Sequence, residues 1–101
     1  MTRSAILLPE ARDDITNAFQ WYEEQSRGLG LEFLRSVEAV LQSIQRLPLS
    51  HPVVHEHYRR ALLRKFPFAL FYEVEEGEGL CVVYSVFHCS QEPAKWRARL
   101  T

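Results

Sequence analysis

The stretch FPFALFYEVEEGEGLCVVYSVFH, residues 66–88, decides the fold that this sequence predicts. Two runs rich in aromatic and β-branched residues, which favour strands, flank Glu76-Gly77-Glu78-Gly79, which is typical of a tight hairpin turn. Both runs are apolar at odd and at even positions, whereas a strand with one solvated face alternates apolar with polar residues. We therefore expect two antiparallel strands, residues 66–75 and 80–88, that are covered on both faces.

Strict alternation along these strands predicts which side chains share a face. On the first strand, one face would carry Phe66, Phe68, Leu70, Tyr72 and Val74, and the other Ala69 and Phe71. On the second strand, one face would carry Leu80, Val82, Tyr84 and Val86, and the other Cys81, Val83 and Phe87.

The N-terminal half predicts a strand followed by a helical hairpin. The apolar run RSAILLP, residues 3–9, is typical of a short strand, and Pro9 suits the first turn of a helix. Two apolar stripes at helical spacing follow, separated by the glycine-containing break SRGLG, residues 26–30. The stripes are Ala11, Ile15, Ala18, Phe19 and Tyr22, and then Phe33, Val37, Val40, Leu41 and Ile44.

The remaining segments complete an α+β fold of the order β-α-α-β-β-β. PLSHP, residues 48–52, predicts a loop, YRRALLRK, residues 58–65, a strand, and PAKWRARL, residues 93–100, a short C-terminal helix. The antiparallel helical hairpin would cover one face of a small, mainly antiparallel sheet. The second face needs the C-terminal segment, a second copy or a partner. Because both faces of the last two strands are apolar, we expect the isolated chain to self-associate or to be poorly soluble, and a partner peptide to relieve this.

The size and composition of the chain limit the classes of function that it can have. A chain of 101 residues predicts a single domain, residues 1–101. A net charge of −1 argues against a protein that coats nucleic acid by bulk attraction. No apolar run reaches the length of a membrane span and no signal-peptide pattern is present, so we expect a cytoplasmic protein without a membrane role.

The stretch VFHCSQEPAKW, residues 86–96, gathers chemically active residue types without predicting an active site. Successive side chains of a strand point to opposite faces, so His88 and Cys89 would not face one another. A tetrahedral zinc site needs four convergent nitrogen or sulfur ligands at a spacing that the chain lacks, and the exposed loop histidines are His51, His55 and His57. We expect no metal, no cofactor and no disulfide between Cys81 and Cys89.

A basic cluster on the strand at residues 58–65 is the better candidate for a binding site. Arg60 and Arg64 would share one side of this strand, and Arg59 and Lys65 the other. Charged side chains protect an exposed edge strand against aggregation, and the same charges would bind an acidic partner. The candidate partner-binding residues are Arg59, Arg60, Arg64, Lys65, Trp96 and Arg97.

Three stretches together resemble the RelE/ParE superfamily, the toxins of type II toxin–antitoxin modules. They are GLGLEFLRSVEAVLQSIQRLP on the second helix, FPFALFYEVEEGE on the hairpin and VFHCSQEPAKW at the end. The resemblance runs from about residue 9 to residue 100 and implies a cognate antitoxin, of the ribbon-helix-helix type. RelE-like members cleave mRNA on the ribosome without metal, and ParE-like members inhibit DNA gyrase by binding.

The resemblance is closer to the ParE-like branch. The cations that RelE-like members carry fall here on Leu62, Ala69 and Cys89, while Arg60 stands at a strand-lysine position. The chain is therefore expected to bind and inhibit a target, DNA gyrase, with no catalytic residues. The alternatives are a ribosome-dependent endoribonuclease using Arg60, Arg64 and His88, and an inactive assembly or regulatory subunit. A homodimer and a hetero-oligomer with the antitoxin both remain open.

Overall fold

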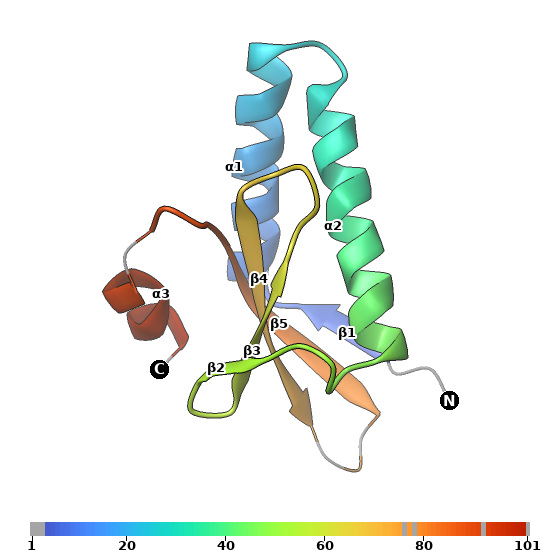
Figure 1. Cartoon of the computed structure of the whole chain (residues 1–101). Helices are drawn as coiled ribbons and strands as arrows, with labels where there is room; N and C mark the ends of the chain where they lie inside the picture. The colour runs from blue at the N-terminus through green and yellow to red at the C-terminus, as the bar shows by residue number, and fades with distance from the viewer. Residues whose placement is uncertain (1–3, 76, 78, 92, 101) are drawn as a thin grey trace.

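The computed structural model describes residues 4–75, 77, 79–91 and 93–100. The strands are β1 (Ser4–Leu7), β2 (Val53–His55), β3 (Tyr58–Leu62), β4 (Phe68–Glu75) and β5 (Leu80–His88), and the helices are α1 (Pro9–Gln25), α2 (Leu29–Arg46) and α3 (Pro93–Leu100). The predicted α+β class and helical hairpin are confirmed (Figure 1). Within the described residues no helix is long and apolar enough to span a membrane.

The sheet has the strand order β1-β5-β4-β3-β2. β1 pairs with β5 in parallel, with Ser4 opposite Leu80, and every other pair is antiparallel. Gly77 and Gly79 adopt positive φ angles of 78° and 61°, which the turn between β4 and β5 requires and a residue with a side chain rarely adopts. Glu76, Glu78 and Arg3, which also belonged to predicted elements, lie outside the described residues.

The helical hairpin is closed by one carboxylate and one close packing contact. Glu23 accepts hydrogen bonds from the backbone N–H groups of Gly28 and Gly30, at 3.0 and 2.9 Å. A Cβ atom at Gly30 would lie 2.8 Å from the ring of Phe19, so any other residue there would force the Phe19 ring to move. The hairpin projects beyond the sheet (Figure 1).

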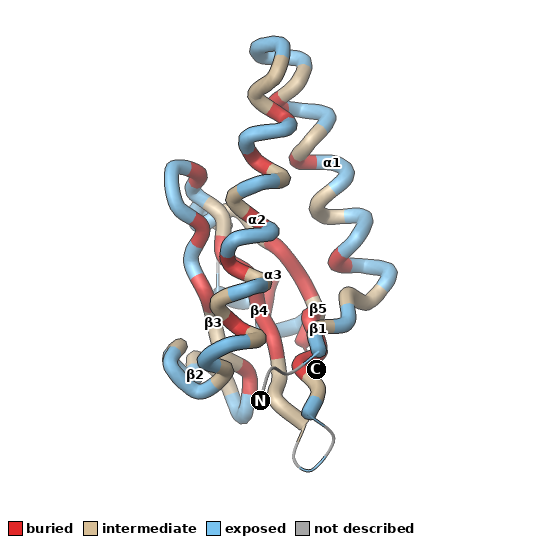
Figure 2. The backbone as a smooth tube through the Cα atoms, turned by 90° about the vertical axis from the view of Figure 1, so that its right-hand side faces the viewer, coloured by how far each residue is buried: buried red, intermediate tan, exposed pale blue. Residues whose placement is uncertain are grey.

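The face of the sheet under α1 and α2 carries the main hydrophobic core. The rings of Tyr22, Phe33, Phe66 and Phe68 meet at centroid distances of 4.9 to 6.0 Å, mostly edge to face. Buried residues are concentrated along β4 and β5, whereas the two long helices alternate buried and exposed residues (Figure 2). The amphipathic stripes predicted for the helices therefore do cover one face.

The C-terminal helix α3 covers the second face. Trp96 stacks on Phe71 with ring centroids 4.8 Å apart, and Leu100 packs into the same cluster. Of the three alternatives for covering this face, the structure thus selects the chain's own C-terminal segment, and self-association through a bare sheet face loses its basis. Arg99 fixes the helix further, because its guanidinium donates to Asp14 of α1 at 2.9 Å.

The predicted strict alternation is wrong for β5. The register with β4 shifts between Phe71, which lies opposite Ser85, and Tyr72, which lies opposite Val83. This β-bulge adds one residue to β5 and reverses the direction of the side chains that follow it. Val86 consequently joins the core under α1 and α2, whereas Tyr84 and Phe87 belong to the cluster under α3.

Two boundaries also differ from the prediction. The strand expected to reach residue 65 ends at Leu62, and Lys65 has a φ of 69°, which no strand residue adopts. Arg64 and Lys65 are therefore turn residues that do not alternate with Arg59 and Arg60. In addition, the loop before β3 contains the short strand β2, which periodicity cannot predict because it has three residues.

Candidate functional site

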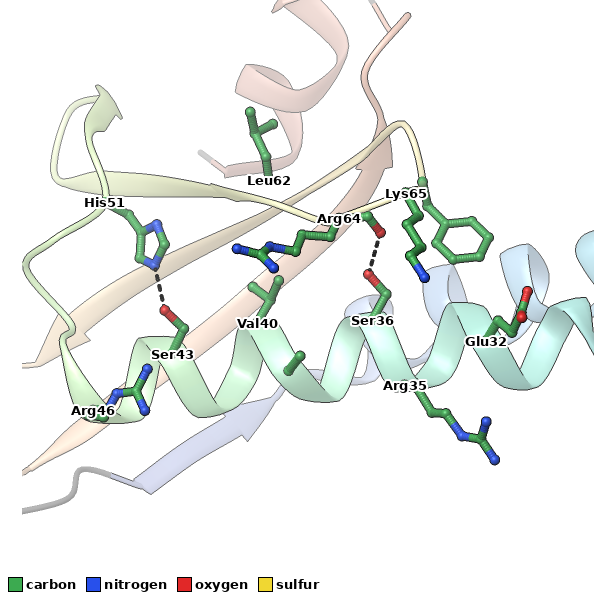
Figure 3. A pocket seen from close by; sticks show the side chains of 12 residues that line it. Glu32, Arg35, Ser36, Val40, Ser43, Arg46, His51, Leu62, Arg64 and Lys65 are labelled. Carbon is green, nitrogen blue, oxygen red and sulfur yellow. Dashed lines mark hydrogen bonds between the residues drawn. The ribbon is translucent and has the colours of Figure 1, made fainter.

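A groove of about 620 Å³ runs between α2 and the far end of β3. We call it the α2 groove; it is lined by Glu32, Arg35, Ser36, Ala39, Val40, Ser43, Arg46, His51, Leu62, Arg64, Lys65 and Phe66 (Figure 3). The α2 residues recur at intervals of three or four, so they form one continuous helix face. The turn after β3 supplies the opposite wall.

The groove is open because β2 is shorter than β3. The backbone N–H of Arg60 is bonded to the carbonyl of Pro52 at 3.0 Å, and the register of β2 reaches no further along β3 than Arg59. On the side of β3 that faces β4, the backbone N–H of Leu63 donates to the carbonyl of Phe68. The backbone groups of successive strand residues point to opposite neighbours, so the N–H and C=O of Leu62 point away from β4, toward the open edge. The side chain of Leu62 is 57% exposed. This edge can accept an added strand.

The walls of the α2 groove are positively charged. Arg35 and Arg46 come from α2, and Arg64 and Lys65 from the turn after β3, against one acid, Glu32 (Figure 3). Among the described residues, no ion pair or side-chain hydrogen bond involves any of the four cations. Alanine, valine and phenylalanine side chains lie between them. The groove therefore offers unpaired cations beside an apolar floor.

One side of the groove is anchored by hydrogen bonds to its backbone. Ser36 donates to the carbonyl of Arg64 at 2.8 Å, which ties α2 to the turn after β3. His51 contacts the hydroxyl of Ser43 at 3.4 Å. Burial, together with the charge of Arg59, lowers the pKa of His51 below its usual value. These contacts fix the width of the groove.

The loop at residues 47–52 is held to the sheet from below. The guanidinium of Arg59 donates to the carbonyls of His51 at 2.6 Å and Leu49 at 3.2 Å. The hydroxyl of Tyr72 donates to the carbonyl of Pro48 at 2.5 Å, and burial raises the pKa of Tyr72 to about 12. Arg59, one of the predicted partner-binding residues, is thus already engaged within the chain.

The other predicted partner-binding residues are divided between two places. Arg64 and Lys65 line the α2 groove, whereas Arg60 and Trp96 line a small pocket on the face under α3. Trp96 is only 8% exposed, and Arg97 lies over its ring at 5.2 Å.

Sequence reasoning missed Arg35, Arg46 and the open edge at Leu62. The two arginines lie on the outer face of α2 at helical spacing, which was a usable signal.

The structure does not bring together the three residues that a nuclease would use. Arg60 and His88 share the small pocket, and Arg64 lies in the α2 groove. His88 accepts a hydrogen bond at Nδ1 from the backbone N–H of Ser90 at 3.0 Å. Since a backbone N–H can only donate, Nδ1 of the neutral ring is the acceptor. The His88 ring also packs against Phe68 of the core under α1 and α2, so it lies on the opposite face of the sheet from the side chain of Arg60.

The histidines, cysteines and acidic side chains are dispersed over the described part of the chain. Within the part of the chain that the structure describes, no group of three histidine, cysteine or acidic residues converges on one point. Cys81 is buried and Cys89 is exposed, and no disulfide joins them. His57 instead pairs with Glu73 at 3.1 Å, and Glu73 accepts a hydrogen bond from Tyr84 at 2.8 Å.

Comparisons with known proteins give one family and a shared fold. The family model described as ParE toxin of type II toxin–antitoxin system, parDE, matches residues 5–93. No curated protein matches the chain significantly.

Two solved structures match with a TM-score of 0.63 each. The toxin–antitoxin complex RelBE2 from Mycobacterium tuberculosis is 18% identical over 87% of this chain and 99% of that chain. The chromosomal ParDE system from P. aeruginosa is 15% identical over 86% of this chain and 96% of that chain.

Proposed function

Because this chain belongs to the ParE toxin family of type II toxin–antitoxin systems, we propose that it inhibits a target protein by binding, that DNA gyrase is this target, and that it cleaves no RNA. The observation that carries the proposal is the separation of Arg60 and His88 from Arg64. Phosphoryl-transfer chemistry needs its acid, base and cations around one reacting atom. Leu62, Ala69 and Cys89 stand where RelE-like members carry further cations, so the chain offers no substitute.

A cognate antitoxin would neutralise the protein through the α2 groove. Its neutralising segment would be acidic, since Arg35, Arg46, Arg64 and Lys65 lack partners among the described residues. An extended part would add a strand at the free edge of Leu62, and apolar side chains would contact the floor of the groove. Charge-assisted hydrogen bonds from the two arginines of α2 would fix its direction.

The activity is tested with two assays run on the same preparations. We expect inhibition of supercoiling by DNA gyrase and no cleavage of mRNA on translating ribosomes. Arg60→Ala and His88→Ala should change inhibition by less than about tenfold, because single contacts in a binding interface contribute gradually. Codon-dependent mRNA cleavage that His88→Ala lowers by about 10²-fold or more would establish the endoribonuclease alternative instead. The absence of both activities would support the alternative that the chain is an inactive subunit.

The antitoxin site is tested by charge reversal. The double change Arg64→Glu and Lys65→Glu should weaken binding of the antitoxin encoded next to this chain by about 10- to 100-fold. The double change Arg27→Glu and Lys95→Glu is the matched control, because it alters the net charge by the same amount at two exposed residues outside the groove. Equal weakening by both changes would mean that general charge attraction, and not the α2 groove, directs the antitoxin.

A further inference from the structure

The small pocket on the face under α3 has a composition that no structural role accounts for. It has a volume of about 40 Å³ and is lined by Arg60, His88, Cys89 and Gln91 over the aromatic rings of Phe71, Phe87 and Trp96, with Ala69 beside them. It lies across the sheet from α1 and α2, under the C-terminal helix. Among the described residues that line it, none carries a carboxylate.

Arg60 is the only arginine of β3 without an internal partner among the described residues. Its neighbour Arg59 is bonded to two backbone carbonyls, and Arg99 of α3 is paired with Asp14. Arg60 is partly buried, yet no hydrogen bond, ion pair or ring contact with a described residue involves its side chain. Keeping an unpaired guanidinium against aromatic side chains lowers stability, unless a bound anion compensates.

Gln91 adds a second donor to the pocket, through its side-chain amide. His88 lies beside it at the end of β5, but its ring packs edge to face against Phe68 at 5.2 Å, on the face under α1 and α2. The pocket therefore provides hydrogen-bond donors from two side chains, the guanidinium of Arg60 and the amide of Gln91.

The size of the pocket selects among anions. A volume of 40 Å³ has room for about three water molecules, which matches a carboxylate group with its adjoining carbon. A phosphodiester carries a sugar on both sides and would not enter. We propose that this pocket binds one carboxylate, from an aspartate or glutamate side chain that projects from a partner protein, through Arg60 and Gln91. This site is separate from the α2 groove, so a toxin could engage one acidic partner at each.

Binding is measured directly with acetate as the probe. In a ¹H–¹⁵N NMR titration of the full chain, we expect acetate to shift the Nε–H signal of Arg60 and the side-chain amide signals of Gln91, saturating at about 10 mM. The same titration with chloride controls for ionic strength. If a short single-stranded oligonucleotide shifted these signals with a higher affinity than acetate, the pocket would bind a phosphodiester and the proposal would be wrong. If acetate did not shift the Arg60 signal, the proposal would be refuted outright.

The melting temperature gives an independent test that distinguishes a binding role of Arg60 from a structural one. Arg60→Met, of similar volume without the charge, should raise the melting temperature by about 2–4 °C and abolish the acetate response. Arg64→Met in the α2 groove is the matched control and should leave both unchanged. A melting temperature lowered by Arg60→Met would mean that Arg60 supports the fold. These measurements need neither toxicity nor gyrase, so they succeed or fail separately from the proposed function.

Discussion

The two faces of the sheet differ in what fills them. Under α1 and α2 lies a continuous apolar core that includes Tyr22, Phe33, Leu70 and Val83. Under α3 the buried cluster is smaller, and polar side chains border its aromatic rings: His55 lies against Trp96, Glu73 accepts from Tyr84, and Arg60 lines the small pocket. We therefore expect the core under the two long helices to contribute more to stability than the cluster under α3, where His55 Nε2 is buried without a hydrogen-bond partner among the described residues.

The strongest test of this division is Phe33→Ala. Phe33 is fully buried and contacts the rings of Tyr22, Phe66 and Phe68. Its removal leaves a cavity that these rings cannot fill, so we expect a loss of about 3–5 kcal/mol in the free energy of unfolding. Urea denaturation measures this loss. A loss below 1 kcal/mol would show that the core under the long helices does not dominate the stability.

The matching change on the other face is Trp96→Ala. It removes the stacking on Phe71 and should cost about 2–4 kcal/mol, less than Phe33→Ala, because α3 is short and packs mainly on β5. The uncovered aromatic side chains should then bind a hydrophobic dye and cause self-association, which light scattering detects. A cost larger than that of Phe33→Ala would reverse the comparison between the faces.

Asp14 of α1 bonds to both β5 and α3, and substitutions of it separate the contribution of the hydrogen bond from that of the ion pair. One of its carboxylate oxygens accepts from the backbone N–H of Val86 at 2.9 Å and from Arg99 at 2.9 Å. Asp14→Ala should cost about 1–3 kcal/mol, because the buried N–H loses its acceptor. Asp14→Asn keeps an acceptor and should cost about 1 kcal/mol or less, the contribution of the partly exposed ion pair. Equal losses would place the whole effect in the ion pair with Arg99.

The smallest expected effect concerns Tyr72, whose hydroxyl holds the loop at residues 47–52. Tyr72→Phe should cost about 1 kcal/mol at neutral pH. Because the pKa of Tyr72 is raised from 10.0 to about 12, the stabilisation is complete below pH 10 and is lost as the pH rises toward 12. The variant should therefore lose less stability than the wild type over that range. Parallel alkaline denaturation curves would contradict this assignment.

Much of the fold could be predicted because its determinants are local. Helical stripes, a glycine break and a hairpin turn each leave a pattern within a few residues, and the helical hairpin, β4 and β5 lie close to the predicted positions. The resemblance to the RelE/ParE superfamily is confirmed by the family match over residues 5–93.

The features that escaped prediction depend on distant partners. The bulge opposite Phe71 arises from the pairing of β4 with β5, and no single-strand pattern reveals it. The α2 groove exists because β2 ends early, which leaves Leu62 at a free edge beside α2. Likewise, Arg59 and Arg60 are adjacent arginines that the sequence cannot tell apart. Only the tertiary structure shows that Arg59 donates to a backbone carbonyl, whereas Arg60 lines the small pocket.

The parallel pairing of β1 with β5 has a consequence for folding during synthesis on the ribosome. Ser4 lies opposite Leu80, so β1 is synthesised long before its partner and stays unpaired until β5 has left the ribosome. The helical hairpin can form early from its local contacts, but closing the sheet requires contacts of high sequence separation, which form slowly. The helical hairpin is therefore expected to be in place before the sheet on which it packs is complete.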